Sequence, residues 1–213
     1  MTRALAVTPI HLPAEEIRRR QARYDRLAPP GLSVELRDVG PAAPGALEDE
    51  ASIRASEREV AAALARAGDG FDLAFPDCVL DPAVPGGPAA GRGVPVNGLL
   101  KLSSMHLSAK NVRFGAVVRN EAIGAELGRR LAAYGLDGYV AGIAVLELPF
   151  DAIADTAAWN AALGEAVDAL AAAGAAAVIN GCSAVDVQED GFRARVVDPT
   201  ALALQLMTVE ASA

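Results

Sequence analysis

The sequence is poor in the residues that most often build metal sites, disulfides and aromatic surfaces. Its 213 residues include 2 Cys, 2 His and 1 Trp, and only 4% of them are aromatic. Neither a Cys-x-x-Cys nor a His-x-x-x-His spacing occurs, so we expect no metal site. The glycines before Val94 lack the spacing of a nucleotide-binding loop, and no Gly-x-Ser-x-Gly turn offers a nucleophilic serine.

Positive charge and long apolar runs are also scarce. The formal net charge is −8, and the arginines of 18–23 are expected to share a helix face opposite Ile17 and Tyr24. Without a basic stripe, we expect no nucleic-acid partner and no binding to an acidic membrane surface. The most apolar run, 169–179, is shorter than a bilayer requires, and the N-terminal apolar stretch is too short for a signal peptide. We therefore expect a cytoplasmic protein.

What the chain has in quantity is small and branched aliphatic residues. Hydrophobic residues make up 52% of it, mostly Ala, Val and Leu, a composition typical of helices packed on a parallel sheet. Strand-like apolar runs alternate with stretches of helical periodicity. Strands are expected over 5–8, 33–39, 71–75, 94–96, 114–118, 140–148, 175–179 and 196–197. Helices are expected over about 13–27, 49–67, 99–109, 121–134, 156–173 and from Pro199 onward, with a Pro- and Gly-rich loop over 81–93.

This alternation predicts an α/β fold with parallel sheets, in which ligands bind beyond the carboxyl ends of the strands. Cys78 and Cys182 each follow a helix, a glycine and a strand, and they lie 182 − 78 = 104 residues apart. The repeat favours two pseudo-symmetric, Rossmann-like lobes. We expect one lobe over 1–96 plus 197–213, carrying Cys78, and the other over 97–196, carrying Cys182.

The two thiols are the candidate catalytic groups. Cysteines in a chain without an export signal are expected to be reduced, and a free Cys is otherwise most often a small buried hydrophobe. Moving a proton from one face of a carbon acid to the other requires two acid/base groups, and a thiolate is favoured by backbone N–H donors. Such donors follow the thiols, at Val79, Leu80, Ser183 and Ala184. The carboxylate of Asp77 opposes thiolate formation unless it points away from Cys78.

Five motifs carry a resemblance to a known family. Residues 72–82, a strand followed by Cys78, two residues and Asp81-Pro82, resemble the first cysteine motif of the aspartate/glutamate racemase superfamily, especially its hydantoin racemase branch. Residues 175–183 are similar to its second motif, strand-Gly-Cys. Three further motifs match in order and spacing: Val7-Thr8-Pro9, Val94-Pro95-Val96 with Gly98, and Val196-Val197-Asp198-Pro199. Together they are specific to the superfamily and much less so to one substrate.

The resemblance implies two lobes, each with a parallel sheet flanked by helices, and an active-site cleft between them. It also implies thiol-mediated proton transfer without a cofactor, a small-molecule substrate and a homo-oligomer. Cys78 and Cys182 carry over as the acid/base pair, and Thr8 and Pro9 as part of the substrate-facing loop. His11 lies in that loop and is a further candidate for substrate contact, whereas His106 is expected at a polar helix position.

Two departures from the family pattern concern the substrate. Arg119 and Asn120 stand where hydroxyl residues usually follow the strand over 114–118, and Ser183 and Ala184 stand where the second motif usually has Ala, Thr or Gly and a further Gly. Arg119 is a candidate for binding a substrate carboxylate, and the alternative is a solvated residue at a helix start.

Three functions are compatible with these residues. The favoured one is a racemase or epimerase acting on a hydantoin-like or amino-acid-like carbon acid with two thiols. The second is a decarboxylase or cis–trans isomerase of a carboxylic acid, for which one cysteine suffices. The third is a catalytically silent ligand-binding protein, compatible with the departures at Arg119, Asn120, Ser183 and Ala184.

Overall fold

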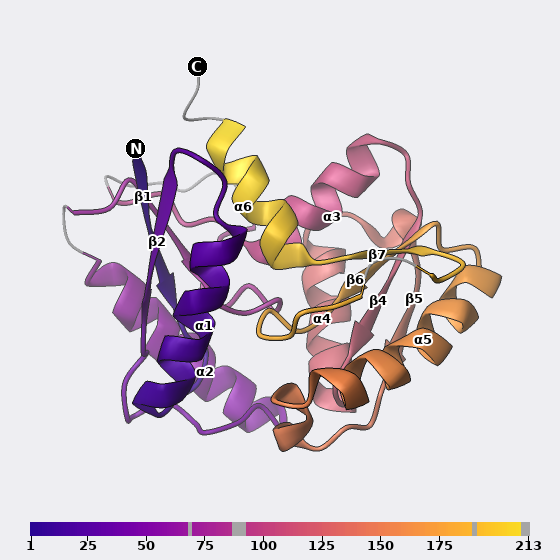
Figure 1. Cartoon of the computed structure of the whole chain (residues 1–213), viewed down its shortest axis with the longest axis horizontal. Coiled ribbons are helices and arrows are strands. Elements are labelled where there is room, and N and C mark those ends of the chain that lie inside the picture. Colours follow the sequence, from indigo (N-terminus) through magenta and orange to yellow (C-terminus); the bar gives the residue numbers. More distant parts are fainter. Residues whose placement is uncertain (68–69, 87–92, 189–190, 210–213) are drawn as a thin grey trace. The chain divides into compact units, whose positions relative to one another are not determined.

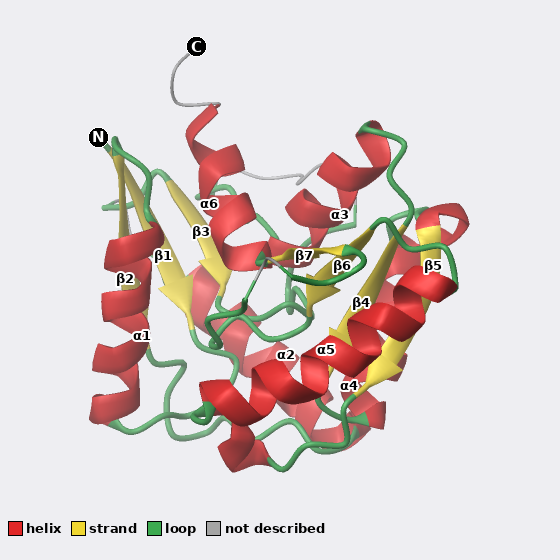
Figure 2. Ribbon diagram, turned by 45° about the vertical axis from the view of Figure 1, so that its right-hand side comes forward, coloured by secondary structure: helices red, strands yellow, loops and turns green. Residues whose placement is uncertain are grey.

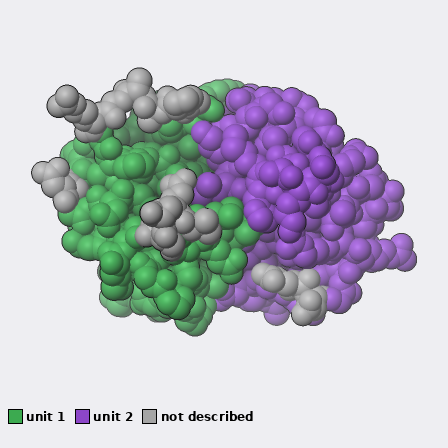
Figure 3. All heavy atoms as spheres, turned by 90° about the horizontal axis from the view of Figure 1, so that it is seen from above, with its two compact units in different colours: residues 1–99, 200–213 green, residues 100–199 purple. Residues whose placement is uncertain are grey.

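The computed structural model describes residues 1–67, 70–86, 93–188 and 191–209. The chain divides into two compact units (Figure 3). Unit 1 consists of Met1–Leu99 and Thr200–Ala213, and unit 2 of Leu100–Pro199. Each unit has its own sheet and its own core, so each presents its functional residues from a separate scaffold (Figure 1).

Unit 1 contains a three-stranded parallel sheet in the order β2-β1-β3. Its strands are β1 (Thr2–Val7), β2 (Leu32–Arg37) and β3 (Leu73–Pro76). Its helices are α1 (Ala14–Leu27), α2 (Glu50–Ala65) and, from Thr200 onward, α6 (Pro199–Val209). Beyond β3, Val96 forms a single parallel bridge with Ala74 and so extends the sheet by one short segment.

Local sequence explains where these elements begin and which side they bury. α2 begins at a capping box: the Asp49 carboxylate accepts from the Ser52 N–H at 2.8 Å, and the Ser52 hydroxyl oxygen accepts from the Asp49 N–H at 3.1 Å. β2 alternates buried and more exposed residues, as expected of an edge strand. The apolar face of α2, with Val60 and Leu64, packs on Leu5 of the central strand.

Unit 2 contains a four-stranded parallel sheet in the order β5-β4-β6-β7 (Figure 2). Its strands are β4 (Phe114–Val118), β5 (Val140–Val145), β6 (Ala177–Asn180) and β7 (Arg195–Val197). Its helices are α3 (Leu99–Ala109), α4 (Glu121–Ala133) and α5 (Thr156–Ala172), with the short 3-10 turns η1 (Asp137–Tyr139) and η2 (Phe150–Ile153).

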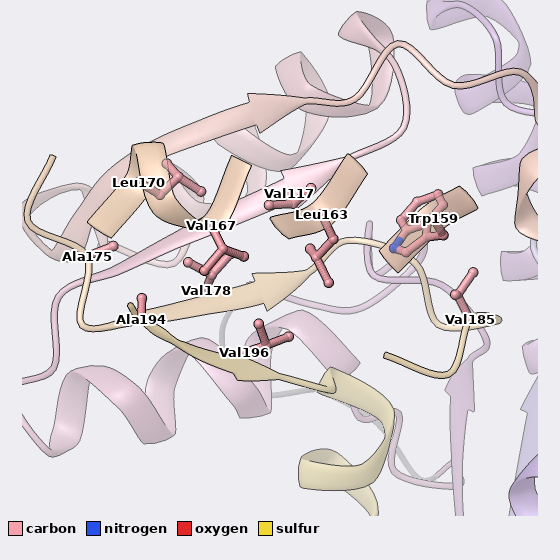
Figure 4. Close-up of a cluster of buried hydrophobic side chains, with 10 residues drawn as sticks. All are labelled: Val117, Trp159, Leu163, Val167, Leu170, Ala175, Val178, Val185, Ala194 and Val196. Atoms are coloured by element: carbon pink, nitrogen blue, oxygen red, sulfur yellow. The ribbon is translucent and has the colours of Figure 1, made fainter. Parts of the chain in front are cut away.

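Helices α4 and α5 cover opposite faces of this sheet. Val117 of β4 packs into the α5 cluster with Trp159 and Leu163, which Figure 4 shows together with the other buried members of the cluster. The next residue, Val118, points to α4, where a Cβ added at Gly124 would lie 3.3 Å from its side chain. Because successive β4 side chains point to opposite faces of the sheet, the strand provides packing surfaces for both α4 and α5.

The two units repeat one topology. In each, the first strand lies between the second and the third, giving β2-β1-β3 and β5-β4-β6. In each, a further short parallel segment pairs outside the third strand, Val96 in unit 1 and β7 in unit 2. A helix then starts three residues after Val96 and two after Val197, and the unit boundary falls at its first residue in both cases. The 104-residue spacing of the cysteines is a consequence of this repeat.

The predicted α/β fold, with two parallel sheets flanked by helices, is confirmed. The strand and helix positions agree closely with the prediction, and the segment 94–96 is a single bridge rather than a full strand. The predicted loop over 81–93 is described up to Gly86 and again from Gly93, and 87–92 lie outside the described residues. Among the described residues, no helix is both long enough and apolar enough to span a bilayer.

Candidate active site

Cys78 lies two residues beyond the end of β3, at the carboxyl edge of the unit 1 sheet. The backbone N–H of Leu80 donates to its sulfur at 3.4 Å, and the residue is only 8% exposed. A turn holds this geometry, because the N–H of Asp81 donates to the Cys78 carbonyl at 3.2 Å. Since a backbone N–H favours the charged form of its acceptor, the turn can support a thiolate.

The aspartate of the Asp-Pro pair in the first cysteine motif has a structural role in this turn. Asp81 is fully buried and has a φ of 50°, in the left-handed region. Its carboxylate lies so close to the backbone of Gly98 that a Cβ there would collide with it. Gly98 directly precedes α3, so the motif ties the turn after Cys78 to the start of that helix.

The carboxylate of Asp77 points away from the thiol and into α1. Its Oδ2 lies 3.1 Å from Nη1 of Arg20, and its Oδ1 accepts from the Tyr24 hydroxyl at 2.7 Å. All three side chains are buried. Burial and the neighbouring Asp77 carboxylate raise the pKa of Tyr24 well above its usual range, so this hydroxyl stays protonated and donates. The negative charge beside Cys78 is thereby balanced.

This cluster corrects the expected helix face of α1. Arg20 and Arg23 are buried on the same side as Tyr24, rather than lying opposite it. Arg20 can be buried because it contacts two carboxylates, Asp77 at 3.1 Å and Glu16 at 2.8 Å. Burial by itself would raise the pKa of Glu16, but hydrogen bonds from Arg20 and its neighbour Arg19 outweigh it and lower that pKa to about 2.

A second cluster follows β1 and β2 at the same edge of the sheet. Asp38, directly after β2, accepts from the Thr8 hydroxyl at 3.2 Å and from the N–H of Leu12 at 3.0 Å. Nδ1 of His11 lies 2.7 Å from its other carboxylate oxygen. Thr8 is fully buried, and its hydroxyl oxygen also accepts from the N–H of Val39 at 2.9 Å. The substrate-facing loop predicted from Thr8, Pro9 and His11 is thus built around Asp38.

Cys182 lies at the corresponding place in unit 2, two residues beyond β6, and is partly buried. The glycine before it is required, because a Cβ at Gly181 would collide with the carbonyl oxygen of Val117 in β4. Asn180 is fully buried, donates to the Cys182 carbonyl at 2.8 Å and accepts from the indole N–H of Trp159 at 3.1 Å. The strand-Gly-Cys motif therefore fixes the backbone on both sides of Gly181.

The remaining predicted residues of unit 2 follow β4 and Cys182. Ser183 and Ala184 are both buried in the turn after the thiol. Arg119 is 4% exposed; its Nη1 donates to the Leu148 carbonyl at 3.3 Å, and its guanidinium lies 5.7 Å from the Phe150 ring centroid. The alternative of a solvated Arg119 is therefore wrong.

The structure gathers the predicted residues into two groups, one in each unit. Thr8, Pro9, His11, Cys78 and Val79 lie at the carboxyl edge of the unit 1 sheet. Arg119, Asn120, Cys182, Ser183 and Ala184 follow β4 and β6, which are neighbours in the unit 2 sheet. Asn120 also caps α4, because its side-chain oxygen accepts from the N–H of Ile123 at 2.9 Å.

Five residues that support these groups were missed from the sequence. They are Arg20, Tyr24, Asp38, Trp159 and Asn180. Each contacts a partner far along the chain, so neither helical nor strand periodicity indicates the polar contact it makes. Asn180 alone carried a signal, as a polar residue closing a buried strand just before a Gly-Cys pair. Among the described residues, no group of three or more His, Cys, Asp or Glu side chains is arranged to hold a metal ion.

Comparisons with known proteins agree with this geometry. The family model described as Asp/Glu/Hydantoin racemase matches residues 17–207. An allantoin racemase from Klebsiella pneumoniae has a similar structure, with a TM-score of 0.79 and 20% identity over 100% of this chain and 88% of that one. An allantoin racemase from Pseudomonas fluorescens gives a TM-score of 0.80 and 16% identity over 99% and 91% of the two chains.

A weaker structural likeness is to a decarboxylase. An unliganded arylmalonate decarboxylase has a TM-score of 0.55 and 15% identity, over 100% of this chain and 93% of that one. No curated protein matches the sequence. At these identities the structural likenesses establish the fold, and the family model, which covers most of the chain, establishes the family.

Proposed function

The chain belongs to the Asp/Glu/hydantoin racemase family, and from this premise we propose that it is a cofactor-independent racemase or epimerase of a carbon acid, with Cys78 and Cys182 as its acid/base pair. The observation that carries the proposal is the repeat: each unit places one cysteine two residues beyond the third strand of the same topology, at the carboxyl edge of its sheet. A reaction that needs two equivalent acid/base groups is matched by a fold that supplies two.

In the proposed reaction, one cysteine thiolate removes the proton from the stereogenic carbon, and the electron pair of the C–H bond moves into the adjacent carbonyl. The other cysteine, as a thiol, donates its proton to the opposite face of the planar intermediate. Reaction in the reverse direction exchanges the two roles. The Leu80 N–H, 3.4 Å from the Cys78 sulfur, supports the thiolate form of that residue.

We propose that the other predicted residues hold the substrate. Thr8, Pro9, His11 and Val79 serve from unit 1. Arg119, Asn120, Ser183 and Ala184 serve from unit 2. The backbone N–H groups of Val79, Ser183 and Ala184 donate hydrogen bonds to the substrate carbonyl oxygen on which negative charge develops. The substrate is a 5-substituted hydantoin or a related amino-acid-like compound, and the racemase likenesses make allantoin the first compound to test.

The test is racemisation of enantiopure 5-substituted hydantoins, allantoin included, followed by polarimetry against an enzyme-free control. We expect loss of optical rotation faster than in the control, undiminished by a metal chelator. A panel that neither racemises nor exchanges its C5 proton with solvent would reject the proposal for this substrate class.

A second candidate is a decarboxylase or cis–trans isomerase of a carboxylic acid with a single cysteine. The difference between the buried Cys78 and the more exposed Cys182 favours it. An activity of this kind that relies on Cys182 survives Cys78→Ser, whereas two-thiol racemisation does not. A silent binding protein would bind hydantoins, detected by calorimetry, and turn none over. We further propose that the protein is a cytoplasmic homo-oligomer. Light scattering on the purified protein tests the oligomeric state.

A further inference from the structure

We propose that Asp38 is a positioning residue that keeps the ring proton of His11 on Nδ1, so that Nε2 of His11 accepts a hydrogen bond from an N–H group of the substrate. This inference rests on the proposed function and deepens it, because it names the chemical group that the unit 1 loop recognises. A neutral cyclic ureide, whose ring and side-chain nitrogens carry N–H groups, presents such a donor. A carboxylate presents only acceptors.

Asp38 determines the tautomer of His11. Its Nδ1 lies 2.7 Å from Oδ2 of Asp38, a short distance for a hydrogen bond. A carboxylate only accepts hydrogen bonds, so Nδ1 must carry the proton, and in the neutral ring Nε2 then holds a lone pair. The contact with Asp38 thus decides which kind of partner the other edge of the ring can take.

The hydrogen bonds around Asp38 hold it as a fixed anion. Its carboxylate also accepts from the N–H of Leu12 at 3.0 Å, the Thr8 hydroxyl at 3.2 Å and the N–H of Gly40 at 3.1 Å. Burial alone would raise the pKa of Asp38, but the hydrogen bonds from His11, Leu12 and Thr8 lower it overall. Asp38 therefore ties the loop after β1 to the end of β2 and holds His11 in one orientation.

His11 and Cys78 follow neighbouring strands of the unit 1 sheet. The loop that carries His11 follows the central strand β1, and Cys78 follows its neighbour β3 at the same edge. The end of β2, with Asp38, is two strand spacings from the end of β3, or roughly 10 Å. The His11 side chain is 49% exposed, and its Nδ1 is occupied by Asp38, so the accessible edge is the one that carries Nε2.

The tautomer can be measured without any substrate. The chain has only 2 histidines, so nitrogen NMR of the ring, with His106→Gln to assign the signals, reports on His11 directly. We expect a protonated Nδ1 in the neutral ring of the wild type. In Asp38→Asn the amide oxygen remains with Leu12 and Thr8, the NH2 group faces His11, and the proton moves to Nε2. A neutral wild-type ring with its proton on Nε2 would overturn the inference.

The contact with substrate is measured in the active enzyme by a double comparison. N-methylation of the ring nitrogens of a 5-substituted hydantoin, one position at a time, removes one N–H donor each. For one position we expect the KM of the wild type to rise about five- to tenfold while kcat changes little, which is the effect typical of losing one hydrogen bond. His11→Ala and Asp38→Asn should raise KM by the same factor on the parent substrate and show no further increase on that analogue. The control His106→Gln should behave as the wild type on both compounds.

The outcomes separate this inference from the proposed function. If the wild type turns over no hydantoin, the proposed function fails, and the NMR result still decides the tautomer. Suppose that hydantoins are racemised, but at every ring position the increases in KM caused by methylation and by His11→Ala are independent and multiply. Recognition of the substrate by His11 is then refuted, while the two-thiol reaction stands. Equal KM values for the wild type and Asp38→Asn would refute the positioning role.

Discussion

The buried contacts of Asp77 allow a quantitative prediction for Tyr24→Phe. The substitution removes one hydroxyl, which donates to Asp77 Oδ1 at 2.7 Å, and keeps the ring, which packs edge-on against Phe75 with centroids 5.7 Å apart. A hydrogen bond to a charged group contributes about 1.5–3 kcal/mol. Because both side chains are almost fully buried, water does not replace the lost donor, and we expect the upper half of this range.

The assay is urea denaturation followed by far-UV circular dichroism. Tyr139→Phe is the matched control, because its hydroxyl makes an exposed 3.5 Å contact with Asn111. We expect the free energy of unfolding to fall by about 2–3 kcal/mol in Tyr24→Phe and by less than about 0.5 kcal/mol in Tyr139→Phe. In a Cys182→Ser background, Tyr24→Phe should also slow alkylation of the remaining thiol, since the neighbouring Asp77 charge is less well balanced.

Two results would refute this reasoning. Equal losses of stability in Tyr24→Phe and Tyr139→Phe would mean that the buried hydrogen bond does not stabilise the fold. A Tyr24→Phe protein that is destabilised as expected but alkylated at the wild-type rate would mean that the Asp77 charge does not reach Cys78. Arg20→Met should give the same changes with a larger loss of about 3–5 kcal/mol, because it leaves a buried charge uncompensated.

The remaining predictions concern pH, a glycine and a buried indole. Glu16→Gln should be less stable than the wild type above about pH 4.5, and the difference should disappear as the pH falls toward 2. The reason is that the pKa of Glu16 is lowered to about 2 in the fold, so its contacts with Arg19 and Arg20 stabilise the protein only while the carboxylate is charged. Urea titrations across this pH range measure the difference. Gly181→Ala should lose about 1–3 kcal/mol and most activity, since its Cβ meets backbone, whereas Gly138→Ala, in open space, should lose neither. Trp159→Phe should lose about 1–3 kcal/mol in thermal unfolding by removing the donor to Asn180.

Much of the scaffold could be predicted from the sequence because its signals are local. The helix over 99–109 and the strand over 114–118 were placed with the observed bounds, since each has a clear periodicity and clear breaks. The positions of both cysteines at strand ends followed from the same alternation. Residues 33–39 alternate Val34, Leu36 and Val39 with polar or charged neighbours, a pattern typical of an edge strand such as β2 and not of a central parallel strand.

The supporting contacts could not be predicted because they are not local. Arg20 and Asp77 are 57 residues apart, and Asp38 is 27 residues from His11. Helical periodicity predicts that an arginine on a helix is exposed to solvent, and only the tertiary structure shows that Arg20 is buried in an ion pair with Asp77. The same holds for Trp159: its helical spacing with Leu163 and Val167 is typical of a core face, and only the tertiary structure shows that its N–H donates to Asn180.

The central claim, that two thiols act on one carbon, is tested most directly by solvent deuterium exchange in each single cysteine variant. Each enantiomer of a hydantoin substrate is incubated in D2O with the wild type, Cys78→Ser or Cys182→Ser, and deuterium and configuration at the carbon are measured together. The two-thiol account predicts that both variants lose racemisation by roughly 100- to 10,000-fold, and that each retains exchange without inversion for one enantiomer only, opposite in the two variants. Racemisation at the wild-type rate in either variant would contradict it.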